Sequence, residues 1–282
     1  MERILVGMDG SAPACDALRW AAKLATITGS EVIAVNALLP VQSEKRPGYL
    51  ERLRQQRADQ LEQWCSDVLD DVPSKLVVDD GDPRDVLLAA MDRHGADLLV
   101  VASSGENSRG PGFLHVGSVV EFLAHHLHRP LAVIAPGAPP DITHALIGVD
   151  GSDHGRQAIS WIADVATASG ARVTAVAVAE PGHPISATEE DAEWRLASER
   201  ILANEWAQPL AALGDRFTAV VSRAAPVADV IVDEAQAAGA DLVVVGARGL
   251  GGITGLRIGG TALAVLHRTD RSVVLVPSPS DR

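Results

Sequence analysis

The residues that could do chemistry in this sequence gather in a glycine-rich stretch toward its C-terminal end. Residues 241–261 read DLVVVGARGLGGITGLRIGGT, so an apolar, β-branched run leads into glycines and then into a helical pattern. Glycines let backbone N–H groups approach a phosphate closely, and the start of a helix adds partial positive charge. The stretch predicts an anion-binding loop between a buried strand and a helix. The alternative is a flexible crossover loop without a ligand.

Two aspartates lie at the ends of predicted strands. Asp9 and Asp150 each follow a short apolar run and precede a Gly-Ser pair. In open α/β sheets, ligands bind at the carboxyl ends of the strands, where a carboxylate can hold a divalent ion or accept hydrogen bonds. An Asp-Gly turn without a ligand is the alternative. Because Ser11 and Ser152 can serve as the helix N-caps, we expect the aspartates to contact a ligand.

Other polar residues carry weaker signals. Arg248 lies inside the glycine stretch, where it would pair with a phosphate or remain solvated. His125, His126 and His128 cluster at a predicted helix end, where the helix dipole favours imidazolium without any metal. The sequence has neither metal-ligand spacing nor a Ser-His-Asp order with its supporting motif. We therefore predict no catalytic residue and no metal site built by the protein alone.

The chain contains an internal repeat, which organises everything else. Gly7, Asp9, Gly10, Ser11 and Trp20 recur in the second half as Gly148, Asp150, Gly151, Ser152 and Trp161. Farther along, Asp85, Gly95, Asp97 and Gly105 recur as Asp229, Gly239, Asp241 and Gly249. The duplication predicts two domains, residues 1–137 and 143–282, joined by a short linker with adjacent prolines. The paired tryptophans are expected in the core of each domain.

Strand and helix patterns alternate in each copy. In the first copy, apolar runs predict strands at 4–8, 32–38, 76–78, 98–102 and 131–135, with helices between them at 13–28, 48–69, 84–94 and 118–127. Short links between alternating elements imply right-handed crossovers. The predicted fold class is therefore α/β, with two tandem doubly wound domains, each a mostly parallel five-stranded sheet flanked by helices.

Composition and charge limit the partners. The chain is 47% hydrophobic and 22% charged, with a net charge of −13. Such an acidic chain, without a Lys/Arg run, repels nucleic acid and anionic membranes. It shows no apolar stretch of about 18 residues and no signal-peptide pattern. Cys15 and Cys65 show neither a CxxC motif nor a paired spacing, which suits reduced thiols. Together these features predict a soluble cytoplasmic protein.

Together these patterns resemble a tandem universal stress protein, over nearly all of both halves. The resemblance rests on Asp9 and Asp150, on the Gly-Ala-Asp runs at 95–97 and 239–241, and above all on the glycine stretch. Nucleotide-binding members of that family carry the pattern G-x2-G-x9-G-[ST] after the fourth strand.

The second copy follows this pattern more closely than the first. Gly246 and Gly249 are followed by nine residues and Gly259, then by Gly260 in place of the hydroxyl residue, with Thr261 one position later. In the first copy Ala102 stands at the first glycine, and eleven residues, including Glu106, separate Gly105 from Gly117 and Ser118. We expect a good nucleotide site in the second copy and a weaker one in the first.

The resemblance implies a ligand and the residues around it. The implied ligand is ATP or a related adenine nucleotide, with Mg²⁺ near Asp150 or Asp9. The residue at the end of the second strand, Ala37 or Val178, would lie against the adenine. The predicted nucleotide-binding residues are Asp150, Val178, Gly246, Arg248, Gly249, Gly259, Gly260 and Thr261 in the second domain and, more weakly, Asp9, Ala37, Gly105, Gly117 and Ser118 in the first.

The resemblance also implies partners and a function. The last strands, at 131–135 and 272–276, would pair within one molecule, as short apolar edge strands tend to do, and a homodimer is a further expectation. The implied function is ATP-binding regulation of a stress response through an unknown regulatory protein partner. A nucleotide-independent interaction module and an enzyme, at most a weak ATPase, are the alternatives.

Overall fold

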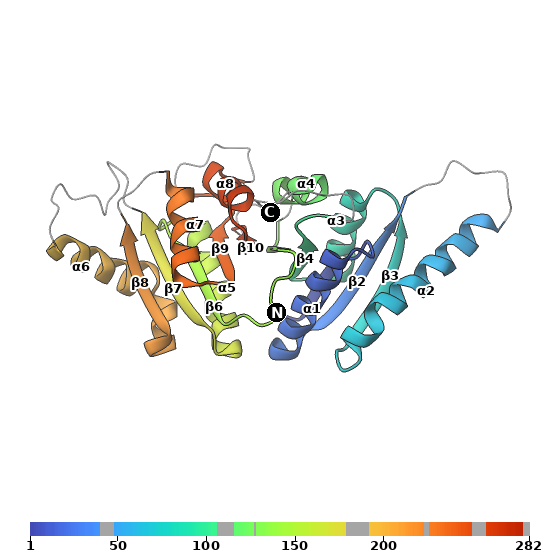
Figure 1. Cartoon of the computed structure of the whole chain (residues 1–282), viewed down its shortest axis with the longest axis horizontal. Helices are drawn as coiled ribbons and strands as arrows, with labels where there is room; N and C mark the ends of the chain where they lie inside the picture. Colours follow the sequence, from blue (N-terminus) through green and yellow to red (C-terminus); the bar gives the residue numbers. More distant parts are fainter. Residues whose placement is uncertain are drawn as a thin grey trace. The chain divides into compact units, whose positions relative to one another are not determined.

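The computed structural model describes residues 1–39, 48–105, 116–126, 128–178, 192–222, 226–249 and 258–278. The chain divides into two compact units, with the boundary between Asp141 and Ile142. In each unit strands and helices alternate along the chain (Figure 1). The predicted α/β fold class is confirmed.

The first unit has a parallel sheet with the strand order β3-β2-β1-β4-β5. The chain moves outward from β1 to β3 and then returns to β4 on the other side of β1. With right-handed crossovers, α1 and α2 therefore pack on one face and α3 and α4 on the other. The elements are β1 (Arg3–Gly7), α1 (Ala12–Thr28), β2 (Glu31–Leu38), α2 (Tyr49–Leu69), β3 (Ser74–Asp80), α3 (Pro83–His94), β4 (Leu98–Ala102), α4 (Ser118–His126) and β5 (Leu131–Ile134).

The second unit repeats this plan with the strand order β10-β9-β6-β7-β8. Its elements are β6 (His144–Gly148), α5 (Asp153–Ser169), β7 (Arg172–Val178), α6 (Ala192–Ile201), β8 (Phe217–Ser222), α7 (Val227–Ala238), β9 (Leu242–Gly246), α8 (Gly260–Arg268) and β10 (Ser272–Val276). The predicted pairing of the two last strands stays a prediction.

One difference between the copies lies before the third strand of each unit. The first unit has the single helix α2 there, whereas in the second unit α6 continues into a π-helical turn, Leu202–Trp206, and a 3₁₀ helix, Gln208–Arg216. Pro209 lies in the first turn of the 3₁₀ helix. Because proline lacks an N–H and its φ already suits a helix, it is tolerated in the first turn of such a helix.

The core is built from aliphatic side chains, as the low aromatic content requires. All five residues of β10 and the first four of β9 are buried, which is typical of strands covered by helices on both faces. Trp20 is only 2% exposed, but Trp161 is half-buried. The expectation that both tryptophans are core residues therefore holds for Trp20 alone.

The two Gly-Ala-Asp runs have a structural role. Gly95 and Gly239 end α3 and α7 in the left-handed conformation, with φ of 60° and 64°. Asp97 Oδ2 accepts a hydrogen bond from the Arg3 backbone N–H at 3.1 Å. Asp241 Oδ2 accepts one from the Thr143 backbone N–H at 2.9 Å. These carboxylates tie the starts of β1 and β6 to the neighbouring strands β4 and β9.

Two further expectations concern membranes and thiols. In the part of the chain that the structure describes, no helix has the length and apolar character needed to span a bilayer. Cys15 is half-buried, Cys65 is buried, and both are free thiols.

Candidate functional site

The candidate site of the second unit lies where two central strands end. β6 and β9 are hydrogen-bonded neighbours, and the chain leaves them in opposite directions, toward β7 and toward β10. Such a switch point leaves a crevice outside the carboxyl ends of the strands. Asp150 follows β6 and the glycine loop follows β9, so the fold brings distant parts of the sequence to one edge of the sheet.

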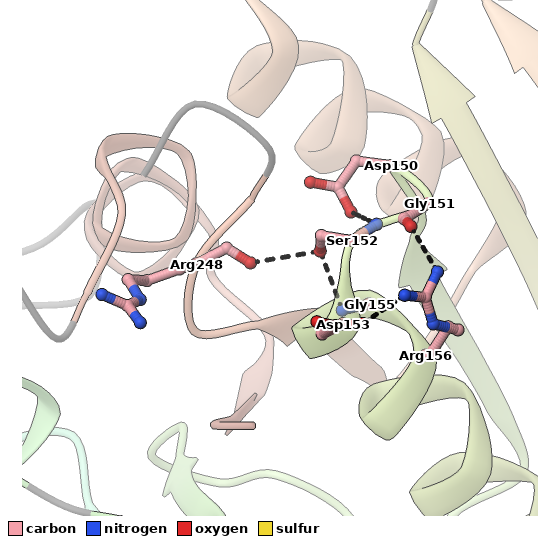
Figure 2. Close-up of polar contacts among 7 residues, drawn as sticks. All are labelled: Asp150, Gly151, Ser152, Asp153, Gly155, Arg156 and Arg248. Atoms are coloured by element: carbon pink, nitrogen blue, oxygen red, sulfur yellow. Dashed lines mark hydrogen bonds and ion pairs between the residues drawn. The ribbon is translucent and has the colours of Figure 1, made fainter. Parts of the chain in front are cut away.

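Asp150 is half-buried, and its two carboxylate oxygens face different neighbours. Oδ1 accepts a hydrogen bond from the Ser152 backbone N–H at 2.9 Å (Figure 2). Oδ2 faces the loop, where a Cβ atom placed on Gly249 would lie 2.5 Å from it. Because Cβ atoms do not occur at such a distance, a side chain at 249 would force the Asp150 carboxylate to move.

Ser152 joins the start of α5 to the loop. Its Oγ accepts a hydrogen bond from the Gly155 backbone N–H at 3.0 Å, which makes it the N-cap of α5, as predicted. The same hydroxyl donates to the carbonyl oxygen of Arg248 at 3.4 Å (Figure 2). The Ser152 hydroxyl therefore links the loop at Arg248 directly to the first turn of α5.

The other two glycines of the predicted pattern have different reasons to be glycine. A Cβ atom on Gly246 would lie 2.8 Å from the carbonyl carbon of His154 and 2.9 Å from the Gly155 nitrogen, so β9 passes directly against the backbone of α5. Gly259 closes the loop, because its backbone N–H donates to the Ala247 carbonyl at 2.7 Å. Both glycines thus shape the two ends of the loop.

The helix that follows the loop begins without a side-chain cap among the described residues. Its N-cap is Gly259, whereas Ser152 caps α5. Gly260 and Thr261, at the start of α8, are exposed, and the space beside the Gly260 Cα is open. First-turn N–H groups at the positive end of a helix dipole form a site that accepts an anion.

Arg248 is turned away from Asp150. Its guanidinium points to the opposite side of the loop in Figure 2, and its Nε lies 3.4 Å from Nε2 of the buried His154. Nδ1 of His154 accepts the Ser278 backbone N–H at 3.0 Å. A neutral imidazole accepts at one nitrogen only, so the bond to Ser278 fixes the ring and the approach of Arg248 is a weak contact.

Val178 lies at the same edge of the sheet as Asp150. The Val149 backbone N–H donates to the Val176 carbonyl at 2.8 Å, which extends the β6–β7 pairing beyond Gly148. This pairing places Asp150 beside the end of β7, where Val178 is the last residue. The side chain of Val178 is 8% exposed.

The first unit repeats the carboxylate arrangement. Asp9 Oδ1 accepts the Ser11 backbone N–H at 2.9 Å, and a Cβ atom on Gly105 would lie 2.9 Å from Asp9 Oδ2. The Gly117 backbone N–H donates to the Ser103 carbonyl at 2.9 Å.

Other predicted residues of the first unit lie around this arrangement. Ser118 begins α4 and is exposed, and Ala37 is half-buried in β2. Glu106 and residues 250–257 lie outside the described residues.

Metal binding by protein alone would need several ligand side chains in one place. Among them, no group of three or more His, Cys, Asp or Glu side chains could hold a metal ion, and this includes the histidines at 125, 126 and 128. Mg²⁺ is commonly bound by one carboxylate together with substrate phosphates. Asp150 is half-buried beside the loop, and a single carboxylate of this kind fits that role.

Sequence reasoning missed four residues near the candidate sites of the two units. His154 and Gly155 pack under the loop, and Trp64 and Trp206 lie against the turns that follow β1 and β6. The tryptophans could have been noticed, because each follows the first strand-helix-strand part of its copy at a similar distance.

Comparisons with known proteins agree with this architecture. The model of the universal stress protein family matches the chain twice, over residues 1–135 and 142–277. A universal stress protein of Mycobacterium bovis is 33% identical over 198 residues, which cover 64% of this chain and 61% of that protein. One of Mycobacterium tuberculosis is 30% identical over 293 residues, covering 94% of each chain. The crystal structure of a universal stress protein from Archaeoglobus fulgidus shares the fold, with a TM-score of 0.75, 15% identity and 98% of each chain covered.

Proposed function

Because the chain belongs to the universal stress protein family, we propose that it is an adenine-nucleotide-binding regulatory protein of the stress response. The proposed ligand is ATP, with Mg²⁺ at its phosphates, and the second unit holds the better site. The observation that carries the proposal is the start of α8, which lacks a side-chain cap among the described residues and exposes Gly260 and Thr261 beside the glycine loop.

The phosphates would bind at the start of α8. Their negative charge would meet the backbone N–H groups of the first turn and the positive end of the helix dipole. The Thr261 hydroxyl is exposed in that turn and would donate to a phosphate oxygen. Such local donors matter because a net charge of −13 opposes anion binding by the chain as a whole.

The base and the metal would bind at the strand ends. Val178 would supply an apolar contact to the adenine, and the Asp150 carboxylate would accept hydrogen bonds from the ligand or contact Mg²⁺. The fixed orientation of Asp150, with Oδ1 bonded to Ser152 and Oδ2 facing Gly249, supports this role because a preorganised carboxylate loses little entropy on binding.

The preference for the second unit rests on the loops. Gly246 admits β9 against the α5 backbone, whereas Ala102 occupies the corresponding place in the first unit. Glu106 adds a negative charge to the first loop, which disfavours a polyanion. We propose tight binding in the second unit and weak binding in the first.

The output of binding would be regulatory, exerted in the cytoplasm through a protein partner. The hydrogen bond from Ser152 Oγ to the Arg248 carbonyl gives the loop a direct connection to α5, so a ligand that moves Arg248 would change the surface near that helix. Hydrolysis would be slow at most, since phosphoryl transfer needs positioned cations and a group that orients water.

Gly260 in place of a hydroxyl residue favours a nucleotide-independent interaction module as the second candidate.

Mass spectrometry of small molecules released from the purified protein tests the proposal directly. We expect ATP or another adenine nucleotide, and calorimetry with added Mg²⁺ and ATP should show saturable binding. A protein that releases no nucleotide and gives no heat with ATP would support the interaction module instead. ATP turnover above background that Asp150→Ala abolishes would support the enzyme.

A further inference from the structure

Each unit places a tryptophan against the turn that carries its candidate site aspartate. In the first unit, a Cβ atom on Gly10 would lie 2.3, 2.6 and 2.8 Å from three atoms of the Trp64 ring. In the second unit, a Cβ atom on Gly151 would lie 3.2, 3.3 and 3.5 Å from three atoms of the Trp206 ring. The same contact therefore occurs twice in the chain.

The two tryptophans lie in different kinds of secondary structure. Trp64 belongs to the α-helix α2, whereas Trp206 is the last residue of the π-helical turn that follows α6. Although the backbone that carries the ring differs, the ring reaches the same glycine in both units.

The ring closes one side of a turn whose glycine has a positive φ. Gly10 and Gly151 have φ of 85° and 77°, in the left-handed region that favours glycine. The indole fills the space where a side chain would otherwise be. A large flat ring with few rotatable bonds restrains its neighbour at a low entropy cost. Both tryptophans are half-buried, so they stand at the edge of the unit and not deep in the core.

The glycine loop closes the other side of the same turn. Asp150 Oδ2 faces Gly249, as Asp9 Oδ2 faces Gly105, while Oδ1 of each aspartate accepts the backbone N–H of the serine two residues later. The Asp-Gly-Ser turn is thus held between an indole and a loop. Removing the indole frees the glycine, and the aspartate next to it loses its fixed orientation.

We propose that Trp206 and Trp64 are positioning residues, which hold the Asp-Gly-Ser turn so that its carboxylate faces the loop of the candidate nucleotide site. That the ligand is ATP rests on the proposed function. That the tryptophan positions the turn rests on the turn geometry alone. The two parts can therefore be tested apart.

Amide hydrogen exchange followed by NMR tests the mechanism without a ligand. In Trp206→Ala we expect the Ser152 N–H, which is bonded to Asp150 Oδ1, to exchange on the order of tenfold faster. Trp206→Phe keeps an aromatic ring and should retain protection near the wild-type level. Trp64→Ala is the matched control, because it should accelerate exchange at Ser11 and leave Ser152 unchanged. Circular dichroism verifies that each variant is folded.

Calorimetry with ATP and Mg²⁺ tests the functional part. Trp206→Ala should weaken ATP binding on the order of tenfold, because a displaced carboxylate is no longer preorganised, and Trp206→Phe should restore most of the affinity. Unchanged exchange at Ser152 in folded Trp206→Ala would overturn the positioning mechanism. Faster exchange at Ser152 with unchanged ATP affinity would show that the positioning by Trp206 does not matter for ATP binding. A wild-type protein that binds no ATP would overturn the proposed function, while the exchange experiment would still decide the mechanism.

Discussion

Gly249 and Asp150 meet across the candidate site, where a Cβ atom on Gly249 would lie 2.5 Å from Asp150 Oδ2. Gly105 and Asp9 stand in the same relationship in the first unit, at 2.9 Å. Neither loop glycine has a left-handed backbone conformation. A side chain at either position would displace the carboxylate opposite, and this dependence can be tested by substitution.

Gly249→Val should abolish ATP binding in the second unit. The added side chain would displace the Asp150 carboxylate and block the approach of the backbone to a phosphate, because valine is both branched and stiff at χ1. Isothermal calorimetry measures the affinity, and circular dichroism checks the fold. Gly249→Ala should weaken binding less, since its Cβ displaces the carboxylate but carries no branch to block the phosphate. Unchanged affinity in the valine variant would show that the site is placed wrongly.

Gly260→Ser should strengthen ATP binding by about tenfold or more, the gain from one hydrogen bond to a charged group. A Cβ atom at 260 meets nothing within 4 Å, so the serine is accommodated without moving its neighbours. Its hydroxyl would stand in the first turn of α8, ready to donate to a phosphate. Gly260→Ala, which adds the Cβ without the hydroxyl, is the control. Equal affinities for the two variants would argue against a phosphate at this position.

The stoichiometry of ATP binding should lie nearer one than two per chain. The first loop carries Ala102 and Glu106 where the second has Gly246 and an uncharged residue. Calorimetric titration of the wild type gives the number of sites, and Gly105→Val compared with Gly249→Val assigns them. We expect the loss of heat only with Gly249→Val. Two equal sites would contradict the assigned asymmetry.

Stability should fall as the pH drops below about 6.5, the usual pKa of histidine. Burial, and secondarily Arg172, lower the pKa of His144, whose ring contacts the Ala238 carbonyl and the Thr174 hydroxyl. Below pH 6.5 the unfolded chain binds a proton that the folded chain does not, so protonation favours unfolding; above it the ring is neutral in both states.

Urea unfolding between pH 5 and 8 measures this dependence. Burial also lowers the pKa of His94, so the contribution of His144 must be isolated with His144→Gln. The variant should be less stable at pH 8 but should lose less further stability on acidification. Parallel pH profiles for the variant and the wild type would mean that His144 does not carry the effect.

Cys65 should resist modification in the folded protein. Burial raises its pKa to about 11, and burial raises that of the half-buried Cys15 as well, so little thiolate is present near neutral pH. A thiol-reactive chromophore should react slowly at Cys65 in buffer and rapidly at both cysteines in guanidinium. Mass spectrometry after alkylation identifies which thiol has reacted. Fast native labelling of Cys65 would contradict its burial.

Much of the fold could be read from local patterns. The alternation of apolar runs with helical periodicity predicted the doubly wound arrangement, and the recurrence of Asp9-Gly10-Ser11 as Asp150-Gly151-Ser152 predicted the duplication. Ser11 and Ser152 were predicted as N-caps and are N-caps. The strands, helices and caps depend on residues within a few positions of one another, and the duplication shows as a direct match between two stretches of sequence, so sequence order is enough to identify both.

Some expectations failed where local reasoning had to judge packing. Trp161 matches the buried Trp20 in the repeat but is half-buried. The second copy does not repeat the long helix α2, because α6 ends at Ile201 and the chain continues as a π-helical turn and a 3₁₀ helix. The exposure of a side chain and the continuity of a helix both depend on neighbours that a repeat pattern does not specify.

By itself the sequence determined the α/β class, the duplication, the family and the glycine pattern, because short-range periodicity and spacing encode them. Only the tertiary structure decided what each glycine is for. It placed Asp150 Oδ2 against Gly249, the α5 backbone against Gly246 and the Trp206 ring against Gly151. These contacts join positions far apart in the chain, and they exist only once the parallel sheet brings the ends of β6 and β9 together and the segment after α6 folds back beside them.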